Sequence, residues 1–254
     1  MNFNLSSIPQ RAKKPRQRGL TMVMDKGLSL QETRNLCEVG SEFIDLLKLG
    51  FGTGLITPNI KEKIEIYQKA GLNTYFGGTM FEAFIARNKF EDYRKFVAES
   101  GVKYAEVSDG VLPIEHDQKC KYIEILSKDI TVVSEVGTKL KGKEISNEKW
   151  VSWMESELQA GAWKVIAEAR ESGNIGIYNN DSSANCSLIE DIREHVLDDN
   201  IIWEAPLKSQ QVWFIKLLGA NVNLGNISNT EIIALEALRN GLRGDTLLDF
   251  LENE

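Results

Sequence analysis

The sequence has little cysteine and histidine, and it has no long apolar run. Its three cysteines, Cys37, Cys120 and Cys186, show no CxxC spacing and indicate neither a zinc ribbon nor a disulfide framework. Its two histidines, His116 and His195, are too few for a multi-histidine metal site. No segment approaches the roughly 20 apolar residues that cross a bilayer, and no signal peptide opens the chain. We therefore expect a cytoplasmic protein without membrane contact.

Acidic residues outnumber basic ones, but the first 18 residues contain only basic charges. The formal charge is −7, and because those 18 residues hold five lysines and arginines, the rest of the chain carries −12. Because this acidic part of the chain repels a phosphate backbone, we expect no nucleic-acid partner. We predict a solvated arm over residues 1–17 that covers one end of the fold, and one domain over residues 18–254.

Short β-branched runs alternate with amphipathic helical patterns along the whole chain. The expected strands are Thr21–Met24, Phe43–Leu49, Leu72–Phe76, Lys103–Val107, Thr131–Val136, Lys164–Ala167, Ile201–Trp203 and Asn221–Leu224. Eight strand–helix units of about 30 residues fit the length of a (β/α)₈ barrel. Alternation alone also permits a doubly wound open sheet, but no GxGxxG turn follows the first strand, and polar residues recur at the same place in nearly every unit. We predict an α/β fold, a single-domain (β/α)₈ TIM barrel.

Carboxylates stand at the ends of several expected strands. These are Glu106, Glu135, Glu168 and Glu204, and each follows an apolar stretch. A buried carboxylate loses several kcal/mol on desolvation unless it is paired or binds a metal. The C-terminal ends of barrel strands meet on the face where such enzymes do chemistry. A single glutamate is equally well explained by a structural ion pair, but the set favours an active site with a hard cation, Mg²⁺ before Zn²⁺.

Three further charged residues end the first two strands and are candidate catalytic residues. Asp25 and Lys26 follow the first strand, and Lys48 ends the second. The alternative for Lys48 is a structural ion pair with a neighbouring glutamate inside the barrel mouth. Lysines that are partly buried or lie near other cations have a lowered pKa and can act as acids.

The other half of the expected mouth suits anions. Its candidate ligands are Arg170, Ser172, Lys208, Ser209, Gly225 and Asn226. Barrels often hold a phosphate in the loops after strands seven and eight, and helix N-termini attract negative charge. We expect Lys208 and Ser209 to open a helix, with Ser209 able to cap it, and Gly225-Asn226 to form a loop after the eighth strand. A plain helix cap is the alternative for Lys208 and Ser209.

Nine short motifs occur in an order that resembles the phosphosulfolactate synthase family, from about Arg18 to Leu247. They are Arg18-Gly-Leu-Thr21 with Asp25-Lys26-Gly27, Lys48-Leu-Gly-Phe-Gly-Thr53, Gly77-Gly-Thr-Met-Phe-Glu82, Glu106-Val-Ser-Asp-Gly110, Glu135-Val-Gly137 with Lys139, Glu168-Ala-Arg-Glu-Ser-Gly173, Glu204-Ala-Pro-Leu-Lys-Ser-Gln-Gln211, Asn223-Leu-Gly-Asn226 and Leu238-Arg-Asn-Gly-Leu-Arg-Gly-Asp-Thr246. The resemblance implies a Mg²⁺-dependent addition of sulfite to phosphoenolpyruvate that gives (2R)-phospho-3-sulfolactate. It also implies a homo-oligomer, and archaeal relatives use the reaction in coenzyme M biosynthesis.

The resemblance further places a lysine after the Glu135-Val-Gly137 motif, and we expect Lys139 to be the general acid that protonates C2. The alternative is a solvated loop lysine, since Lys141 and Lys143 follow closely. The family often carries two lysines here, and Thr138 replaces the first.

Two other functions stay open at this stage. A family member without synthase activity would act through protein partners in stress tolerance. Another phosphate-handling barrel, such as an aldolase, would need a Schiff-base lysine, with Lys48 or Lys164 as candidates.

Overall fold

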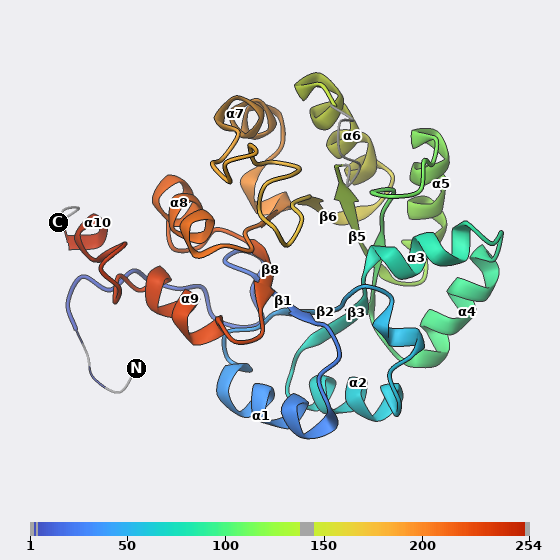
Figure 1. The fold of residues 1–254 in the computed structure, drawn as a ribbon, viewed down its shortest axis with the longest axis horizontal. Coiled ribbons are helices and arrows are strands. Elements are labelled where there is room, and N and C mark those ends of the chain that lie inside the picture. The colour runs from blue at the N-terminus through green and yellow to red at the C-terminus, as the bar shows by residue number, and fades with distance from the viewer. Residues whose placement is uncertain (1–2, 4, 138–144, 252–254) are drawn as a thin grey trace.

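The core of the molecule is a ring of parallel strands in a computed structural model that describes residue 3 and residues 5–137 and 145–251. The strands in the described residues are β1 (Thr21–Asp25), β2 (Leu46–Leu49), β3 (Asn73–Phe76), β4 (Tyr104–Val107), β5 (Thr131–Val136), β6 (Ala162–Ala167), β7 (Ile201–Glu204) and β8 (Leu224–Ser228). They form one sheet in the order β3-β2-β1-β8-β7-β6-β5-β4. Its two end strands, β3 and β4, contact each other and nearly close the ring (Figure 1). The predicted single-domain (β/α)₈ barrel is confirmed.

Helices surround this ring on the outside (Figure 1). The described helices are α1 (Leu30–Gly40), η1 (Thr53–Leu55), α2 (Ile60–Lys69), α3 (Gly78–Ile85), α4 (Phe90–Ser100), α5 (His116–Leu126), α6 (Asn147–Gln159), α7 (Cys186–His195), η2 (Asp198–Asn200), α8 (Lys208–Leu218), α9 (Ile232–Arg239) and α10 (Leu247–Leu251). Local sequence sets several of their ends. Ser29 caps α1 in a reciprocal capping box with Glu32, and Gly101 ends α4 at a φ of 74°. None of the described helices is both long and apolar enough to span a bilayer.

The strands bury both of their faces, because one face meets the helices and the other fills the barrel interior. The interior layer consists of Met22, Met24, Leu46, Tyr75, Val133, Ile166 and Ile202. Side chains two residues apart on a strand share a face. The positions two residues beyond Leu46, Val133, Ile166 and Ile202 are Lys48, Glu135, Glu168 and Glu204. The apolar layer therefore leads directly into a layer of charged side chains at the carboxyl end, which we call the mouth.

The eighth strand differs from its prediction. It begins at Leu224 and ends at Ser228, so Gly225 and Asn226 lie inside the strand and the expected loop at these residues is wrong. A Cβ on Gly225 would lie 2.5 Å from Met22 Cε and 2.9 Å from Ile202 Cγ2. The glycine is present because the interior layer approaches the strand closely there, which overrides the turn preference of a Gly-Asn pair.

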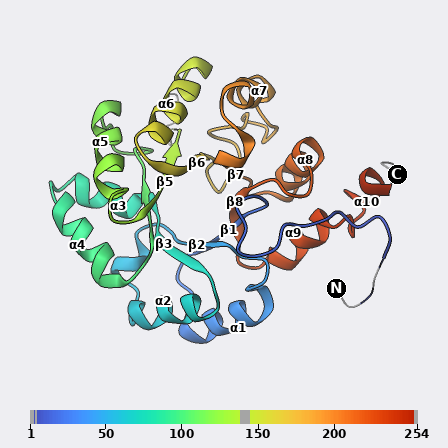
Figure 2. The same cartoon turned by 180° about the vertical axis from the view of Figure 1, so that it is seen from behind.

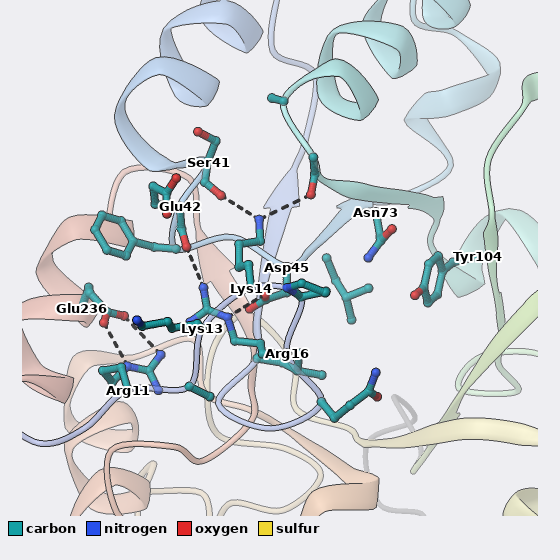
Figure 3. Close-up of a pocket in the computed structure, with 18 of the residues that line it drawn as sticks. Arg11, Lys13, Lys14, Arg16, Ser41, Glu42, Asp45, Asn73, Tyr104 and Glu236 are labelled. Atoms are coloured by element: carbon teal, nitrogen blue, oxygen red, sulfur yellow. Dashed lines mark hydrogen bonds and ion pairs between the residues drawn. The ribbon is translucent and has the colours of Figure 1, made fainter.

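At the opposite end of the barrel, the floor, the basic arm runs past α9, β8 and β1 (Figure 2). A cavity of about 780 Å³ lies between the arm and the barrel, and Figure 3 shows how the arm's cations are held. Lys14 Nζ donates to the carbonyl oxygens of Ser41 at 2.7 Å and Ile44 at 2.5 Å. Arg11 Nε lies 2.9 Å from Glu236, and Arg16 Nε lies 3.0 Å from Asp45. These cations already have partners within the chain. We therefore interpret this cavity as a gap between the arm and the barrel rather than as a binding site for a charged ligand.

Candidate active site

A cavity of about 330 Å³ opens at the mouth, and most of the predicted site residues that the structure describes line it. The lining residues are Met24, Lys48, Phe51, Gly77, Gly78, Thr79, Glu106, Glu135, Glu168, Ala169, Arg170, Glu171, Ser172, Glu204 and Asn226. They come from several strands that are far apart in sequence. This is the arrangement that places barrel active sites at the C-terminal ends of the strands.

Lys48 lies among the carboxylates and is almost fully buried. Its Nζ lies 2.9 Å from Glu106 Oε2, 3.0 Å from Glu135 Oε2 and 3.7 Å from Glu204 Oε1. Burial alone would lower the pKa of Lys48, but the three glutamates outweigh it and raise the pKa well above its ordinary value. Lys48 is therefore a permanent cation at neutral pH. The ion pair that was the alternative for this lysine is present, with three partners rather than one.

Three of the four glutamates predicted as metal ligands form a compact group. Carboxylate oxygens of Glu135, Glu168 and Glu204 lie within 4.8 Å of one another, and all three residues are buried. Oxygen ligands at this spacing fit a hard divalent cation such as Mg²⁺. Among the described residues, five glutamates line the cavity together with Lys48 and Arg170, and Lys26 pairs with Glu171 at the rim. The donor set therefore fits a magnesium ion.

Glu106 has different neighbours from the other three glutamates. Its Oε1 accepts a hydrogen bond from the backbone N–H of Gly78 at 2.5 Å, and its Oε2 pairs with Lys48. Gly78 opens α3, so this carboxylate lies at a helix N-terminus, where the helix dipole favours negative charge. Glu106 thus joins Lys48 to the start of α3 rather than to the compact group.

Asp25 lies outside the cavity. Its side chain points toward α2, where Lys63 Nζ lies 2.6 Å away and the Tyr67 hydroxyl donates to it at 2.8 Å. The backbone N–H groups of Gly27 and Leu28 donate to its other oxygen, both at 2.8 Å. This carboxylate fixes the end of β1. Lys26 is half exposed at the rim and pairs with Glu171.

The predicted anion ligands separate into two groups. Arg170, Ser172 and Asn226 line the cavity, and the Asn226 amide donates to the carbonyl of Ala169 at 3.0 Å. Lys208 and Ser209 are exposed outside it, and Lys208 pairs with Asp245 at 2.9 Å. The expected capping role of Ser209 is wrong, because α8 begins at Lys208 and its N-cap is Leu207.

The remaining predicted residues are Gly225 and Lys139. Gly225 lies within β8, where it faces the interior layer rather than the cavity lining. Lys139 and its neighbour Thr138 lie outside the described residues.

Glu82 and Ser108 were not predicted as site residues, although both are buried beside the mouth. Ser108 Oγ lies 3.0 Å from Glu135 Oε1 and 3.1 Å from Glu82 Oε1. Glu82 lies on α3, four residues after Gly78, so its position in a helix hid its relation to the strand ends. The sequence carried one usable signal, since Ser108 follows Glu106 at strand spacing.

Tyr75 lies in the interior layer directly beneath this charged layer, paired in register with Lys48. Burial, followed by the negative charge of Glu106, raises its pKa well above the ordinary value. The phenol therefore stays neutral at physiological pH.

The sequence profile of the (2R)-phospho-3-sulfolactate synthase (ComA) family matches residues 9–245. The chain belongs to the phosphosulfolactate synthase family. It is 43% identical over 249 residues to the phosphosulfolactate synthase of Methanothermobacter thermautotrophicus, an alignment that covers 94% of this chain and 95% of the relative. It is 38% identical over 250 residues to the phosphosulfolactate synthase of Bacillus subtilis, covering 97% and 99% respectively. The family resemblance seen in the motifs is confirmed, and the chain is an enzyme of the carbon–sulfur lyase type.

Solved barrels of other families share the fold at low sequence identity. The 3-hexulose-6-phosphate synthase of Salmonella typhimurium superposes with a TM-score of 0.54 at 14% identity, over 92% of this chain and 100% of that one. The 3-keto-L-gulonate-6-phosphate decarboxylase of Vibrio cholerae gives 0.55 at 8% identity, over 92% and 98%. At this identity the likeness extends to the fold alone.

Proposed function

We propose that this enzyme adds sulfite to phosphoenolpyruvate in a Mg²⁺-dependent reaction that gives (2R)-phospho-3-sulfolactate. The observation that carries the proposal is the buried group of Glu135, Glu168 and Glu204 beside Lys48, in a chain of this family. In the reaction the sulfur lone pair forms a bond to C3, the C2–C3 double bond opens, and a proton is added at C2. The phosphate ester stays intact throughout.

The proposed metal ligands are Glu135, Glu168 and Glu204. A Mg²⁺ ion bound there supplies a Lewis acid that stabilises negative charge on the substrate carboxylate. Glu106 is held by Gly78 and Lys48, and it keeps that lysine beside the group.

The remaining residues bind anions or move the proton. Lys48 stays protonated because its pKa is raised, so it attracts anionic substrate and is a poor proton donor. Arg170, Ser172 and Asn226 line the same cavity and are the proposed substrate contacts. Bringing two anions together is a large part of the task, since positioning removes much of the entropic barrier. Lys139 is the proposed donor of the proton to C2.

The aldolase alternative needs a neutral lysine amine within the site. Lys48 is held as a cation by three carboxylates, which opposes Schiff-base formation. Lys164 lies at the floor end, where its Nζ donates to the carbonyl of Asp199. Neither placement favours that chemistry. A cytoplasmic location and a homo-oligomer remain predictions of the sequence.

The test is turnover of the purified protein with phosphoenolpyruvate, sulfite and Mg²⁺, followed by mass spectrometry of the product. We expect a sulfonated phosphate ester as the product, and we expect no product to form when EDTA removes the metal. Glu168→Gln should lower turnover by about two orders of magnitude or more, because a metal ligand is lost. Glu190→Gln, an exposed change on α7, is the matched control. Absence of product with the wild-type enzyme across metal and pH conditions would refute the proposal.

A further inference from the structure

We propose that Glu82 is a positioning residue that sets the orientation of Glu135 through the hydroxyl of Ser108. The inference rests on the proposed function only in taking Glu135 as a metal ligand. Glu82 itself is placed on the helix side of the barrel wall and is not part of the compact glutamate group.

The three side chains form a continuous chain of oxygen atoms. Ser108 Oγ lies 3.1 Å from Glu82 Oε1 on one side and 3.0 Å from Glu135 Oε1 on the other. The exposed fractions are 5% for Glu82, 0% for Ser108 and 2% for Glu135, so bulk water does not compete for these contacts. In such surroundings a hydrogen bond to a carboxylate is stronger than it is in water.

Glu82 is fixed by backbone groups that do not depend on Ser108. Its Oε2 accepts hydrogen bonds from the N–H groups of Val111 at 2.9 Å and Leu112 at 2.5 Å. These residues belong to the loop that follows β4. The carboxylate therefore ties α3 to this loop and presents its other oxygen to Ser108 at a fixed place.

Ser108 has little freedom to move away from this line. A Cβ on Gly78 would lie 2.3 Å from Ser108 Cβ, so α3 packs directly against the serine. One hydroxyl carries one proton, so Ser108 donates to one of the two carboxylates at a time, while its oxygen accepts from the N–H of Gly110 at 3.3 Å. The serine is thus held between two carboxylates, and its position limits where Glu135 Oε1 can lie.

The orientation of a metal ligand is set by the groups that hydrogen-bond to it. Loss of such an outer partner typically lowers metal affinity or activity about 10–100-fold. Lys48 holds Glu135 through Oε2, and Ser108 holds it through Oε1. Removing the Ser108 contact takes away one of the groups that fix the orientation of this carboxylate.

The test is the affinity for MgCl₂ alone, measured by isothermal titration calorimetry on the full-length enzyme without substrate. Ser108→Ala and Glu82→Ala should each raise the Mg²⁺ dissociation constant about 10–100-fold. Glu82→Gln should restore affinity to within about threefold of wild type. Its amide oxygen can accept from Val111 and Leu112, while its N–H₂ donates to Ser108 and turns the serine proton toward Glu135.

Ser134→Ala is the matched control, because Ser134 is an equally buried serine that directly precedes Glu135 and contacts Glu157 of α6 on the helix side. We expect it to leave Mg²⁺ affinity unchanged. Wild-type affinity in Ser108→Ala, or equal losses in Glu82→Gln and Glu82→Ala, would overturn the positioning role. Thermal melts of each variant in EDTA separate loss of folding from loss of affinity. A wild type that binds Mg²⁺ but forms no product would refute the proposed reaction and leave the positioning role standing.

Discussion

The two ends of the barrel both bury cations, but they give those cations different partners. At the mouth, Lys48 faces carboxylate oxygens of Glu106, Glu135 and Glu204. At the floor, Arg239 is fully buried and donates to the backbone carbonyls of Ala220 and Val222, both at 2.7 Å. Burial lowers the pKa of Arg239 to about 9, so the guanidinium is still protonated at neutral pH.

The difference in partners indicates that the mouth binds ligands, whereas the floor stabilises the fold. A backbone carbonyl carries no net charge and cannot turn toward a ligand, so Arg239 is satisfied where it lies. The floor cations of the arm, Arg11 and Arg16, each pair with one carboxylate, Glu236 and Asp45. Among the described residues that line the mouth, carboxylates outnumber cations, and a carboxylate can exchange a lysine partner for a metal ion. A divalent ion is therefore expected at the mouth and not at the floor. Changes at the mouth should alter turnover, whereas changes at the floor should alter stability.

The largest expected effect is at the mouth, from Lys139→Ala. Loss of a general acid lowers kcat about 10²–10⁴-fold, with little change in melting temperature. Lys141→Ala and Lys143→Ala are the controls and should leave kcat nearly unchanged. Steady-state kinetics and thermal melts of the three variants make the comparison. Small and equal effects at all three lysines would assign the proton donor to another group.

An intermediate effect is expected at the floor, from Arg239→Leu. The variant removes the Arg239 hydrogen bonds to the carbonyls of Ala220, Val222 and Leu20, which precede β8 and β1, and this should cost about 3 kcal/mol of folding free energy. The kcat of the folded fraction should not change. Urea unfolding followed by activity measurements tests both statements, with Arg34→Leu as an exposed control that should cost under about 1 kcal/mol. A variant with normal stability and impaired kcat would reverse the assignment of the two ends.

The smallest effect concerns Glu236, whose pKa reflects two opposing causes. Burial raises the pKa of Glu236, but the hydrogen bond and charge of Arg11, with smaller contributions from Arg239 and Asn240, outweigh burial and hold the pKa below its ordinary value. A carboxyl with a lowered folded pKa stabilises the protein above its unfolded pKa, and this contribution is lost as pH falls through the folded pKa.

Glu236→Gln should therefore cost about 1 kcal/mol at pH 7. The gap to wild type should shrink as pH falls from about 4.5 through the lowered folded pKa. Urea unfolding of both proteins between pH 3 and pH 7 measures the gap. A gap that stays constant over this range would show that the charge of Glu236 does not hold the arm.

The barrel and the strand-end glutamates could be predicted because each glutamate closes an apolar run. Asp25 gave the same signal as Glu106 yet lies on the other face of its strand. In a parallel barrel both faces of a strand are buried, so hydrophobicity does not reveal which side chains face inward. Which side chains of β1 face inward becomes clear only from the pairing of the strands, in which Met24 lies opposite Lys48 and Asp25 lies opposite Leu49.

The anion ligands were harder to predict, because their positions depend on where a strand stops. Gly225 has a turn-forming sequence, but it lies in β8, since only a residue without a side chain fits beside Met22. Lys208 and Ser209 start a helix as expected, although Lys208 turns to Asp245 on the outside. Glu82 could not be predicted as a site residue, because it reaches the mouth through the packing of α3 on β4, and such a tertiary contact leaves no local pattern in the sequence.

The arm has a consequence for the order of folding during synthesis. Arg11 hydrogen-bonds to Glu236 of α9 and to the carbonyl of Ala220, partners more than 200 residues away along the chain. A ribosome that has made only the first half of the barrel has not yet made either partner. The Arg11 part of the arm therefore docks late, whereas Lys14 and Arg16 contact residues 41–45, which are made early. Contacts of such long sequence separation are slow to form, so docking of Arg11 is expected to be a late step in refolding as well.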